Sequence, residues 1–309
     1  MKKQILILFS IFLFIFSGYA QTIHPQMNLK KGQQYTQTSN AKITVDQVIE
    51  EKTITIFTNV IGGITYNVTE VTENGYWLEA SYDSLKLTMD AGFMNIEMNS
   101  EADEDVTDSL SGLYSNIMKN MIDKSFQVKM LKNGSIGEIK NIDNLYKNIF
   151  DAYPQLSEDI KETIISELKN SYGEDAFEGN LEMASPVFPD YPVGKGDTWT
   201  NETALNSAFI IGKINTTFKL LDFDDEKIIL EGNSLIKTYI DSLDNNKLTG
   251  IRYDLSGKMH NTMIIDRETG WTLTSEVKQN LTGEGEFREQ KVQVTLKSMM
   301  KMDGIIREK

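Results

Sequence analysis

The stretch that decides the fold runs from Trp271 to Thr282 and reads WTLTSEVKQNLT. Its apolar side chains fall on one face of an extended chain, at Trp271, Leu273, Val277 and Leu281. The residues between them are polar, and this two-residue period is typical of an antiparallel strand with one face in water. A tight turn from Asp266 to Gly270 precedes it. The stretch therefore predicts a half-buried strand that is entered through a turn.

The same alternation recurs through most of the chain. Between residues 32 and 98 it places apolar side chains at Ile43, Val45, Ile54, Ile56, Leu85, Leu87 and Met89. Turns are expected at Gly62-Gly63 and at residues 73–75, where positive φ is needed. Residues 126–139 are expected to form a hairpin, and a last strand starts near Val292. Most of the chain is therefore predicted to be antiparallel sheet.

Helical segments interrupt this alternation. After an acidic loop at 99–108, a short helix is expected to begin at Asp108 or Ser109, with apolar side chains at Leu110, Leu113, Ile117 and Met121. Residues 143–152 form a second expected helix. A third is capped by Ser157 and ends at Gly173, with apolar side chains at Ile160, Ile164, Leu168 and Tyr172.

These patterns predict a β-dominated α+β protein. We expect two antiparallel β-sheet modules, or one curved half-barrel, with a helical segment between them. The proline-rich stretch at 184–196 marks the boundary before the second module. The expected organisation is a signal peptide at 1–20, a first β-rich module at 21–140, the helical segment at 141–183 and a second β-rich module at 184–309.

The first twenty residues have the organisation of a cleavable signal peptide. A basic start precedes an apolar run from Ile5 to Phe16, and small residues follow at Gly18 and Ala20. We expect cleavage between Ala20 and Gln21, with export to the periplasm, the cell surface or the extracellular space. No later stretch is apolar enough to span a bilayer, so no transmembrane segment is expected after cleavage.

Charge and cysteine content argue against several classes of protein. The chain has no cysteine, so neither a disulfide scaffold nor a lipid-anchored lipoprotein is expected. Its formal net charge is −14, and such a surface repels nucleic-acid phosphates and anionic lipid headgroups. We therefore expect neither a nucleic-acid partner nor peripheral binding to a membrane.

Two segments of the chain resemble each other. Lys31–Thr36 reads KGQQYT and Lys195–Thr200 reads KGDTWT, and residues 66–79 alternate in the same way as residues 218–231. Internal duplication into two related β modules would explain this likeness. Amphipathic strands also resemble one another by chance, so both interpretations stay open.

Four features together point to a known group of proteins. They are the two Lys-Gly-x-x-Tyr/Trp-Thr openings, Phe126–Ile139, Pro189–Thr200 and Asp266–Leu273. In these features the chain resembles an uncharacterised family of exported Bacteroidota proteins, a domain of unknown function. The resemblance implies a β-rich protein of the periplasm or outer surface, and it implies no catalytic residue.

No catalytic constellation stands out in the sequence. The two histidines, His24 and His260, lie in unrelated contexts, and the Gly-x-Ser-x-Gly motif of serine hydrolases is absent. Glu101–Asp108 and Asp222–Glu226 are dense in oxygen ligands that suit calcium, but neither has the spacing of an EF-hand loop. These segments are interpreted as solvated acidic loops or as calcium sites. No cofactor is expected.

Three Asp-Ser-Leu triplets are centred on Ser84, Ser109 and Ser242. They resemble the Asp-Ser/Thr-apolar acceptor motif of O-glycosylation in Bacteroidota. We expect these serines to be candidate modification sites, with chance occurrence of a short motif as the alternative.

We hypothesise a non-catalytic binding or carrier protein for an apolar small molecule. Its long amphipathic strands can curl around an apolar cavity that the 157–172 helix partly covers. Methionines at 89–130 and 259–302 would line this cavity or fill the core. The alternative is a structural or adhesive protein that binds other envelope proteins. A glycan-acting enzyme with a carboxylate pair is the third hypothesis.

Overall fold

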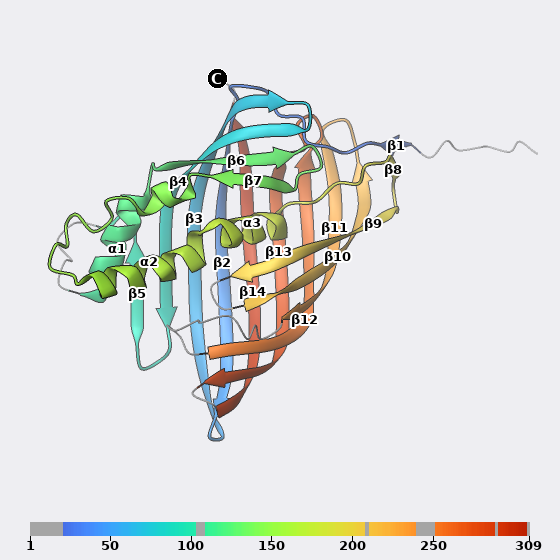
Figure 1. The fold of residues 1–309 in the computed structure, drawn as a ribbon. Helices are drawn as coiled ribbons and strands as arrows, with labels where there is room; N and C mark the ends of the chain where they lie inside the picture. The colour runs from blue at the N-terminus through green and yellow to red at the C-terminus, as the bar shows by residue number, and fades with distance from the viewer. Residues whose placement is uncertain (1–20, 103–108, 208–209, 239–250, 288–289, 308–309) are drawn as a thin grey trace, which may run out of the picture.

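A computed structural model of the chain describes residues 21–102, 109–207, 210–238, 251–287 and 290–307. One antiparallel sheet of twelve strands dominates it, and the sheet curls around three helices (Figure 1). The strands of its first half are β2 (Gln34–Ile49), β3 (Lys52–Thr72), β4 (Gly75–Asp90), β5 (Asn95–Asn99), β6 (Ser125–Leu131) and β7 (Ile136–Lys140). Those of its second half are β9 (Thr198–Ser207), β10 (Ile210–Phe223), β11 (Lys227–Thr238), β12 (Ile251–Asp266), β13 (Thr272–Phe287) and β14 (Gln290–Arg307).

The two halves form one continuous sheet. β14 pairs with β2 from Gln293–Val48 to Arg307–Gln34, and the described sheet ends at β7 on one edge and at β9 on the other. The fold is therefore β-dominated α+β, and it takes the second of the two expected forms, a single curved half-barrel. The predicted strand at 271–282 is confirmed as β13, which extends to Phe287.

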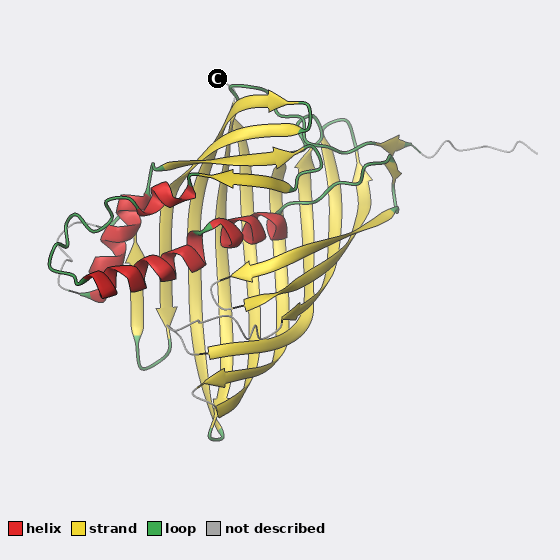
Figure 2. Cartoon of the chain, viewed as in Figure 1, coloured by secondary structure: helices red, strands yellow, loops and turns green. Residues whose placement is uncertain are grey.

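The helices lie on the concave side of the sheet (Figure 2), and all but the first lie in the sequence between its two halves. They are α1 (Leu110–Met121), the 3₁₀ helix η1 (Ile142–Tyr146), α2 (Glu158–Tyr172) and α3 (Glu174–Ala184). Ser109 caps α1 by accepting from the Gly112 amide at 3.0 Å, and Ser157 caps α2. Both predicted N-caps are confirmed.

Three details of the helical prediction were wrong. Leu110 and Ile160 are 61% and 47% exposed, because the first turns of α1 and α2 lie outside the packed core. Residues 143–152 do not form a helix: the segment leaves η1 at Lys147, and Asn148 takes a positive φ of 58° that breaks helical geometry. α3 was not foreseen as a separate helix. Gly173 ends α2 and is also the N-cap residue of α3.

The turn expected at Gly62-Gly63 was also wrong. Both glycines lie inside β3, at a bulge where Asp83 is the extra residue of β4. Glycine in a strand often marks such a bulge instead of a turn. The chain reverses earlier, at Glu50 and Glu51, which have φ of 48° and 65°. Glutamate is rare in turns of this kind, so residue type does not predict the turn.

The two similar openings have the same local structure. Gly32 and Gly196 both have positive φ, of 86° and 93°. The Gly32 amide donates to the Val68 carbonyl and the Gly196 amide donates to the Leu220 carbonyl, at 2.9 and 2.8 Å. The ladder also shifts register just after Val68 in β3 and after Leu220 in β10. These shared features support the duplication interpretation.

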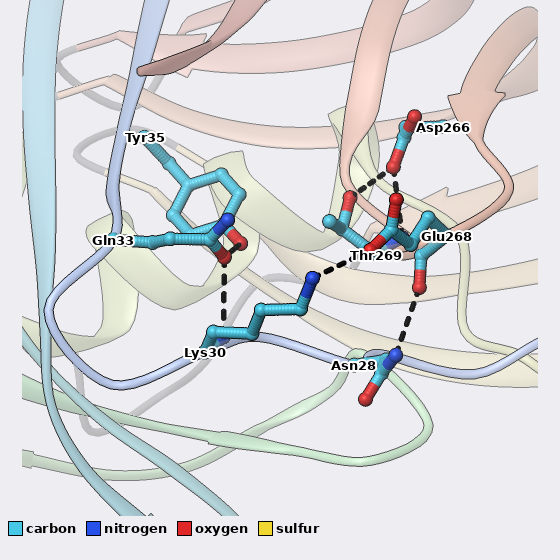
Figure 3. A network of polar contacts seen from close by, with 7 residues as sticks. All are labelled: Asn28, Lys30, Gln33, Tyr35, Asp266, Glu268 and Thr269. Atoms are coloured by element: carbon cyan, nitrogen blue, oxygen red, sulfur yellow. Dashed lines mark hydrogen bonds and ion pairs between the residues drawn. The ribbon is translucent and has the colours of Figure 1, made fainter. Parts of the chain in front are cut away.

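A strap before β2 closes one end of the half-barrel. It follows β1 (Thr22–Ile23), which pairs with β8 (Val193–Gly194). The Asn28 amide donates to the Thr269 carbonyl at 2.8 Å, and Lys30 forms an ion pair with Glu268 at 2.5 Å. Figure 3 shows the side-chain contacts of this region, in which the Asn28 side-chain amide donates to the Glu268 carbonyl at 3.0 Å and Asp266 accepts from both the amide and the hydroxyl of Thr269. The strap thus ties the start of the chain to the turn before β13.

Beneath the strap, aromatic rings pack on the inner face of the sheet. Trp271 is 1% exposed, and its ring centroid lies 4.6 Å from that of Tyr35 and 5.4 Å from that of Tyr66. The Tyr35 hydroxyl donates to Gln33 at 2.5 Å. Burial, with Asp266 nearby, raises the pKa of Tyr35 to about 12.

Glycines allow close approach where the second half of the sheet curls. A Cβ on Gly257 would lie 2.0 Å from the Asn280 carbonyl oxygen, and one on Gly283 would lie 2.1 Å from that of Asp254. No larger residue fits these positions without moving the backbone. In Figure 2 the strands of this half bend strongly, unlike the straighter β2 and β3.

We predict that Gly257→Ala lowers the free energy of unfolding by about 2–4 kcal/mol, because the backbone must shift to admit the methyl group. Gly232→Ala is the matched control. Its added Cβ would meet its nearest atoms at 3.4 Å, so it should change stability by less than about 1 kcal/mol. Urea denaturation of both variants checks this, and equal losses would contradict it.

We also predict a loss of stability at alkaline pH. An unfolded tyrosine ionises near pH 10, whereas Tyr35 keeps its proton to about pH 12 in the folded chain. Below pH 10 the buried, protonated Tyr35 makes its full contribution to the free energy of unfolding. Between these two values it falls by about 1.4 kcal/mol per pH unit, because only the unfolded chain releases the proton. Tyr35→Phe should make the decline of unfolding free energy from pH 9 to 11 shallower, and an unchanged slope would refute this.

Candidate functional site

The side of the sheet that faces the helices, here called the inner face, is defined by its cross-strand registers. One row crosses seven strands through Ile214, Ile236, Gly257, Leu281, Leu296, Val45 and Ile56. Because side chains alternate along a strand, every second residue from this row also points inward. Tyr35, Tyr66 and Val68 belong to this face and pack in one core with Ile117 of α1 and Phe177 of α3.

The inner face carries no charged side chain over most of its length. None of its positions is Asp, Glu, Lys or Arg along the following parts of the described strands: 35–49 of β2, 54–68 of β3, 212–220 of β10, 228–238 of β11, 253–263 of β12, 275–285 of β13 and 292–306 of β14. In a chain with 25% charged residues, this is strong segregation.

The outer face takes the charges instead. Neighbouring residues there form ion pairs, among them Lys278–Glu276 at 2.5 Å and Lys291–Glu284 at 3.0 Å. Such exposed pairs add little stability, so their main effect is to keep this face hydrated. The sheet therefore separates a wet outer face from an uncharged inner face.

Two parts of the inner face are packed. The first lies under the helices, where Ile164 and Leu168 of α2 are 4% and 3% exposed. The second lies where the second half curls: Ile214, Leu255 and Leu281 are at most 2% exposed and cluster with Met183 of α3. The prediction of a cavity beneath the 157–172 helix is therefore wrong, because the buried side chains of that helix pack on the core.

A third part of the inner face is only half-buried. We call it the apolar strip, and it consists of Ile54, Ile56, Val60, Met89 and Ile96. It borders Leu87 and Met98, which pack against the core around α1. The registers place Met89 opposite Ile96 and Val60 opposite Leu87, so strands β3, β4 and β5 supply one apolar surface. Thr58 is the neutral polar residue within it.

The methionine clusters divide between core and strip. Met118, Met121 and Met130 are at most 3% exposed and fill the core. Met89 is half-buried within the strip, whereas Met98 and Met300 are half-buried and pack against the two core clusters. A flexible thioether can adapt to ligands of different shape, so Met89 suits a binding surface.

A separate hollow of about 410 Å³ lies on the outer face of β11, β12 and β13. His260, Lys258 and Leu235 are among its lining residues. His260 Nδ1 lies 3.0 Å from Asn233 Oδ1 and 3.9 Å from a Glu231 oxygen. His260 therefore has ordinary strand neighbours, and no hydroxyl or thiol nucleophile is recorded bonded to it among the described residues.

The acidic segment at 222–226 has structural partners. Asp224 accepts from the amides of Glu226 and Lys227 at 2.8 and 2.7 Å, and these bonds lower its pKa. Asp222 pairs with Lys195, and Asp225 pairs with Arg267. In the described residues no three acidic or histidine side chains converge as a metal site would require. Most of the 101–108 segment lies outside the described residues.

The other predicted positions are scattered. Ser84 is half-buried in β4, Ser109 is the exposed N-cap residue of α1, and Gln21 is exposed before β1. Ala20 and Ser242 lie outside the described residues, as does the whole 1–20 segment. His24 is exposed in the strap. The structure brings none of the described ones together with the apolar strip.

Sequence reasoning placed Ile54, Ile56 and Met89 on apolar strand faces but did not single them out as a site. The signal that could have found them is that every second residue of these long strands, on the face that points inward, is uncharged. Among the described residues, none of the helices combines the length and the apolar character needed to cross a membrane.

Comparison with known proteins gives a family but no activity. Residues 73–272 match the model of DUF6263, a family of unknown function. No curated protein matches the chain. The structure is similar to that of lipovitellin, solved in a study of lipid–protein interactions, with a TM-score of 0.49, 11% identity and 91% of this chain covered. This chain spans 26% of the lipovitellin chain.

Two bacterial structures are less similar. An outer membrane channel of Pseudomonas putida F1 has a TM-score of 0.22 and 7% identity, over 90% of this chain and 97% of the channel. An outer membrane lipoprotein-sorting protein domain of Vibrio parahaemolyticus has a TM-score of 0.14 and 10% identity, over 87% of this chain and 84% of the domain. None of these likenesses assigns a function to this chain.

We predict that truncation costs differ between the packed and half-buried parts of one inner-face row. Leu281→Ala should lower the free energy of unfolding by about 2–5 kcal/mol, because it leaves a cavity in a packed core. Ile56→Ala should cost less than about 1.5 kcal/mol, since water already reaches that side chain. Urea denaturation measures both, and similar costs would show that the strip is packed.

Proposed function

The chain belongs to DUF6263, a family of unknown function, and we propose that it is a non-catalytic binding or carrier protein for an apolar ligand, exported to the periplasm or cell surface. One observation carries the proposal, which is the half-buried apolar strip on an inner face without charges. The basic, apolar and small-residue pattern of residues 1–21 supports export.

The strip favours an aliphatic chain as the ligand. Apolar surface removed from water contributes about 25 cal/mol per Å², so covering on the order of 200 Å² would contribute roughly 5 kcal/mol before the cost of association. Along the described parts of the strands, the inner face has no charged group that could pair with an ionic headgroup. A charged headgroup would therefore stay in water, at the rim of the half-barrel.

A non-catalytic role is supported by where the reactive groups lie. His260 is on the outer face and His24 is in the strap, so neither histidine faces the strip. The strip holds aliphatic and thioether side chains, and its one polar member, Thr58, has no base recorded beside it in the described structure. This arrangement suits binding, whereas proton transfer needs a positioned acid or base.

The adhesive alternative draws on a different observation. Leu235, which is 62% exposed, is one of the residues that line the outer hollow. A protein partner could insert an apolar side chain there. We place this second because the hollow is lined by charged and polar side chains such as Lys258, His260 and Lys278, whereas the strip is aliphatic apart from Met89 and Thr58.

The direct test is to purify the chain from residue 21 onward, extract it with organic solvent and look for lipid by mass spectrometry. Titration with a fluorescent fatty acid then measures affinity. We predict that Ile56→Lys weakens binding by at least about tenfold, because a charge would enter the uncharged surface. Phe57→Lys is the matched control, since the neighbouring side chain is 56% exposed on the outer face, and it should stay within about twofold.

Circular dichroism and melting temperature must show that both variants are folded. Absence of co-purified lipid together with absence of fatty-acid binding would remove the carrier proposal. Equal weakening by the two lysine substitutions would move the site away from the strip.

A further inference from the structure

The turn between β4 and β5 exposes two apolar side chains. Phe93 is 78% exposed, more than any other large apolar side chain recorded as exposed in the described structure, and Met94 is 43% exposed. Figure 1 shows this turn projecting freely at the lower left of the molecule, beyond α1. A single exposed apolar side chain is common, but here two neighbouring ones share one turn, which makes the turn a candidate contact surface.

The turn is held in one shape. The Ala91 amide donates to the Met94 carbonyl at 2.9 Å, and the Gly92 amide donates to Asp90 Oδ1 at 2.7 Å. Gly92 has a φ of 78°, which L-residues rarely adopt, and Ala91 is buried. Phe93 therefore stands in water on an ordered turn whose hydrogen bonds fix its position.

The turn continues the apolar strip. Met89 and Ile96 of the strip are a cross-strand pair, and the next pair toward the turn is Asp90–Asn95. From Ala91 to Ile96 no residue is charged. The nearest charges are already engaged, because Asp90 accepts from Gly92 and Glu97 forms an ion pair with Lys86 at 2.8 Å. An apolar path thus runs from the strip to the tip of the turn.

We propose that this turn is the site where the protein docks on a zwitterionic lipid surface to take up or release its ligand. The inference rests on the proposed function, because the docking site adjoins the strip that would hold the ligand. A lipid surface fits better than a protein groove, since the tip offers two apolar side chains without a charge to fix a specific partner.

Charge and size set the kind of contact. The formal net charge of −14 disfavours anionic membranes, so neutral headgroups are the fitting surface. Two inserted side chains give only a weak and reversible attachment. A carrier needs this, because it must dissociate from the membrane after it has taken up its ligand. The turn itself carries no charge from Ala91 to Ile96, so lipid headgroups do not repel it as anionic headgroups would repel the acidic surface elsewhere.

The test uses flotation of the chain from residue 21 onward with phosphatidylcholine vesicles. Wild type should float with the vesicles, and the double variant Phe93→Ser/Met94→Ser should lose this binding by about fivefold or more. Leu235→Ser is the matched control, because its side chain is 62% exposed on the outer face away from the turn, and it should bind as wild type does. When vesicles are added, the tryptophan fluorescence of the Phe93→Trp variant should shift to shorter wavelength, relative to that of wild type.

A second readout separates docking from ligand binding. In the double variant, equilibrium affinity for a fluorescent fatty acid should be unchanged, while its transfer rate from vesicles should fall. Flotation of the double variant at the wild-type level, or absence of flotation by wild type, would overturn the docking inference and leave the carrier proposal standing. Failure of wild type to bind the fatty acid would instead overturn the carrier proposal.

Discussion

The backbone ladder between β14 and β2 joins the two ends of the chain. It runs from Gln293–Val48 to Arg307–Gln34 and places the last strand beside the first long one. Without it, β2–β7 and β9–β13 would be two sheets, each with an exposed edge that invites association. With it they form one surface, and the inner-face rows continue across the junction through Leu296 and Val45. The apolar strip and the curled second half depend on this continuity.

On that continuous sheet, alternation separates the charges from the inner face. A strand turns every second side chain to the same side, so one charged residue in the wrong register would lie on the inner face. In the packed regions around Leu281 and Trp271, such a charge would be desolvated at a cost of several kcal/mol. Near Ile56 and Val60 water still has access, so stability alone does not require an apolar residue there. The absence of charge at these positions is consistent with the proposed ligand-binding role.

The packing of the helices determines where the strip remains. α1 packs on β5, where Ser115 Oγ accepts from the Asn99 amide at 3.0 Å, and α3 packs near β9. Between these contacts the described helices leave Ile54, Ile56 and Val60 half-buried. The glycine positions Gly257 and Gly283 let the second half curl and bury its own inner face. One half of the sheet therefore fills its concavity with its own side chains, and the other half does not.

Local features of this fold could be read from the sequence. Alternation predicted β13, and the Ser109 and Ser157 caps follow from residues within one helical turn. The pairing of β14 with β2 could not be read, because it joins residues about 250 positions apart and no local propensity encodes it. Alternation placed Ile54 and Ile56 on an apolar face, but whether a helix covers that face is decided by tertiary packing. The same limit explains why Gly62-Gly63 was read as a turn.

The central claim is that an aliphatic chain lies on the apolar strip. A fatty acid with a photoactivatable diazirine at its tail reports this directly, because light links the tail to whatever side chain it touches. After irradiation and proteolysis, mass spectrometry locates the adducts. We expect adducts at inward residues of β3, β4 and β5, among them Ile56, Val60 and Met89, and none at the outward Phe57. Adducts on the outer face of β11–β13, or none above background, would contradict it.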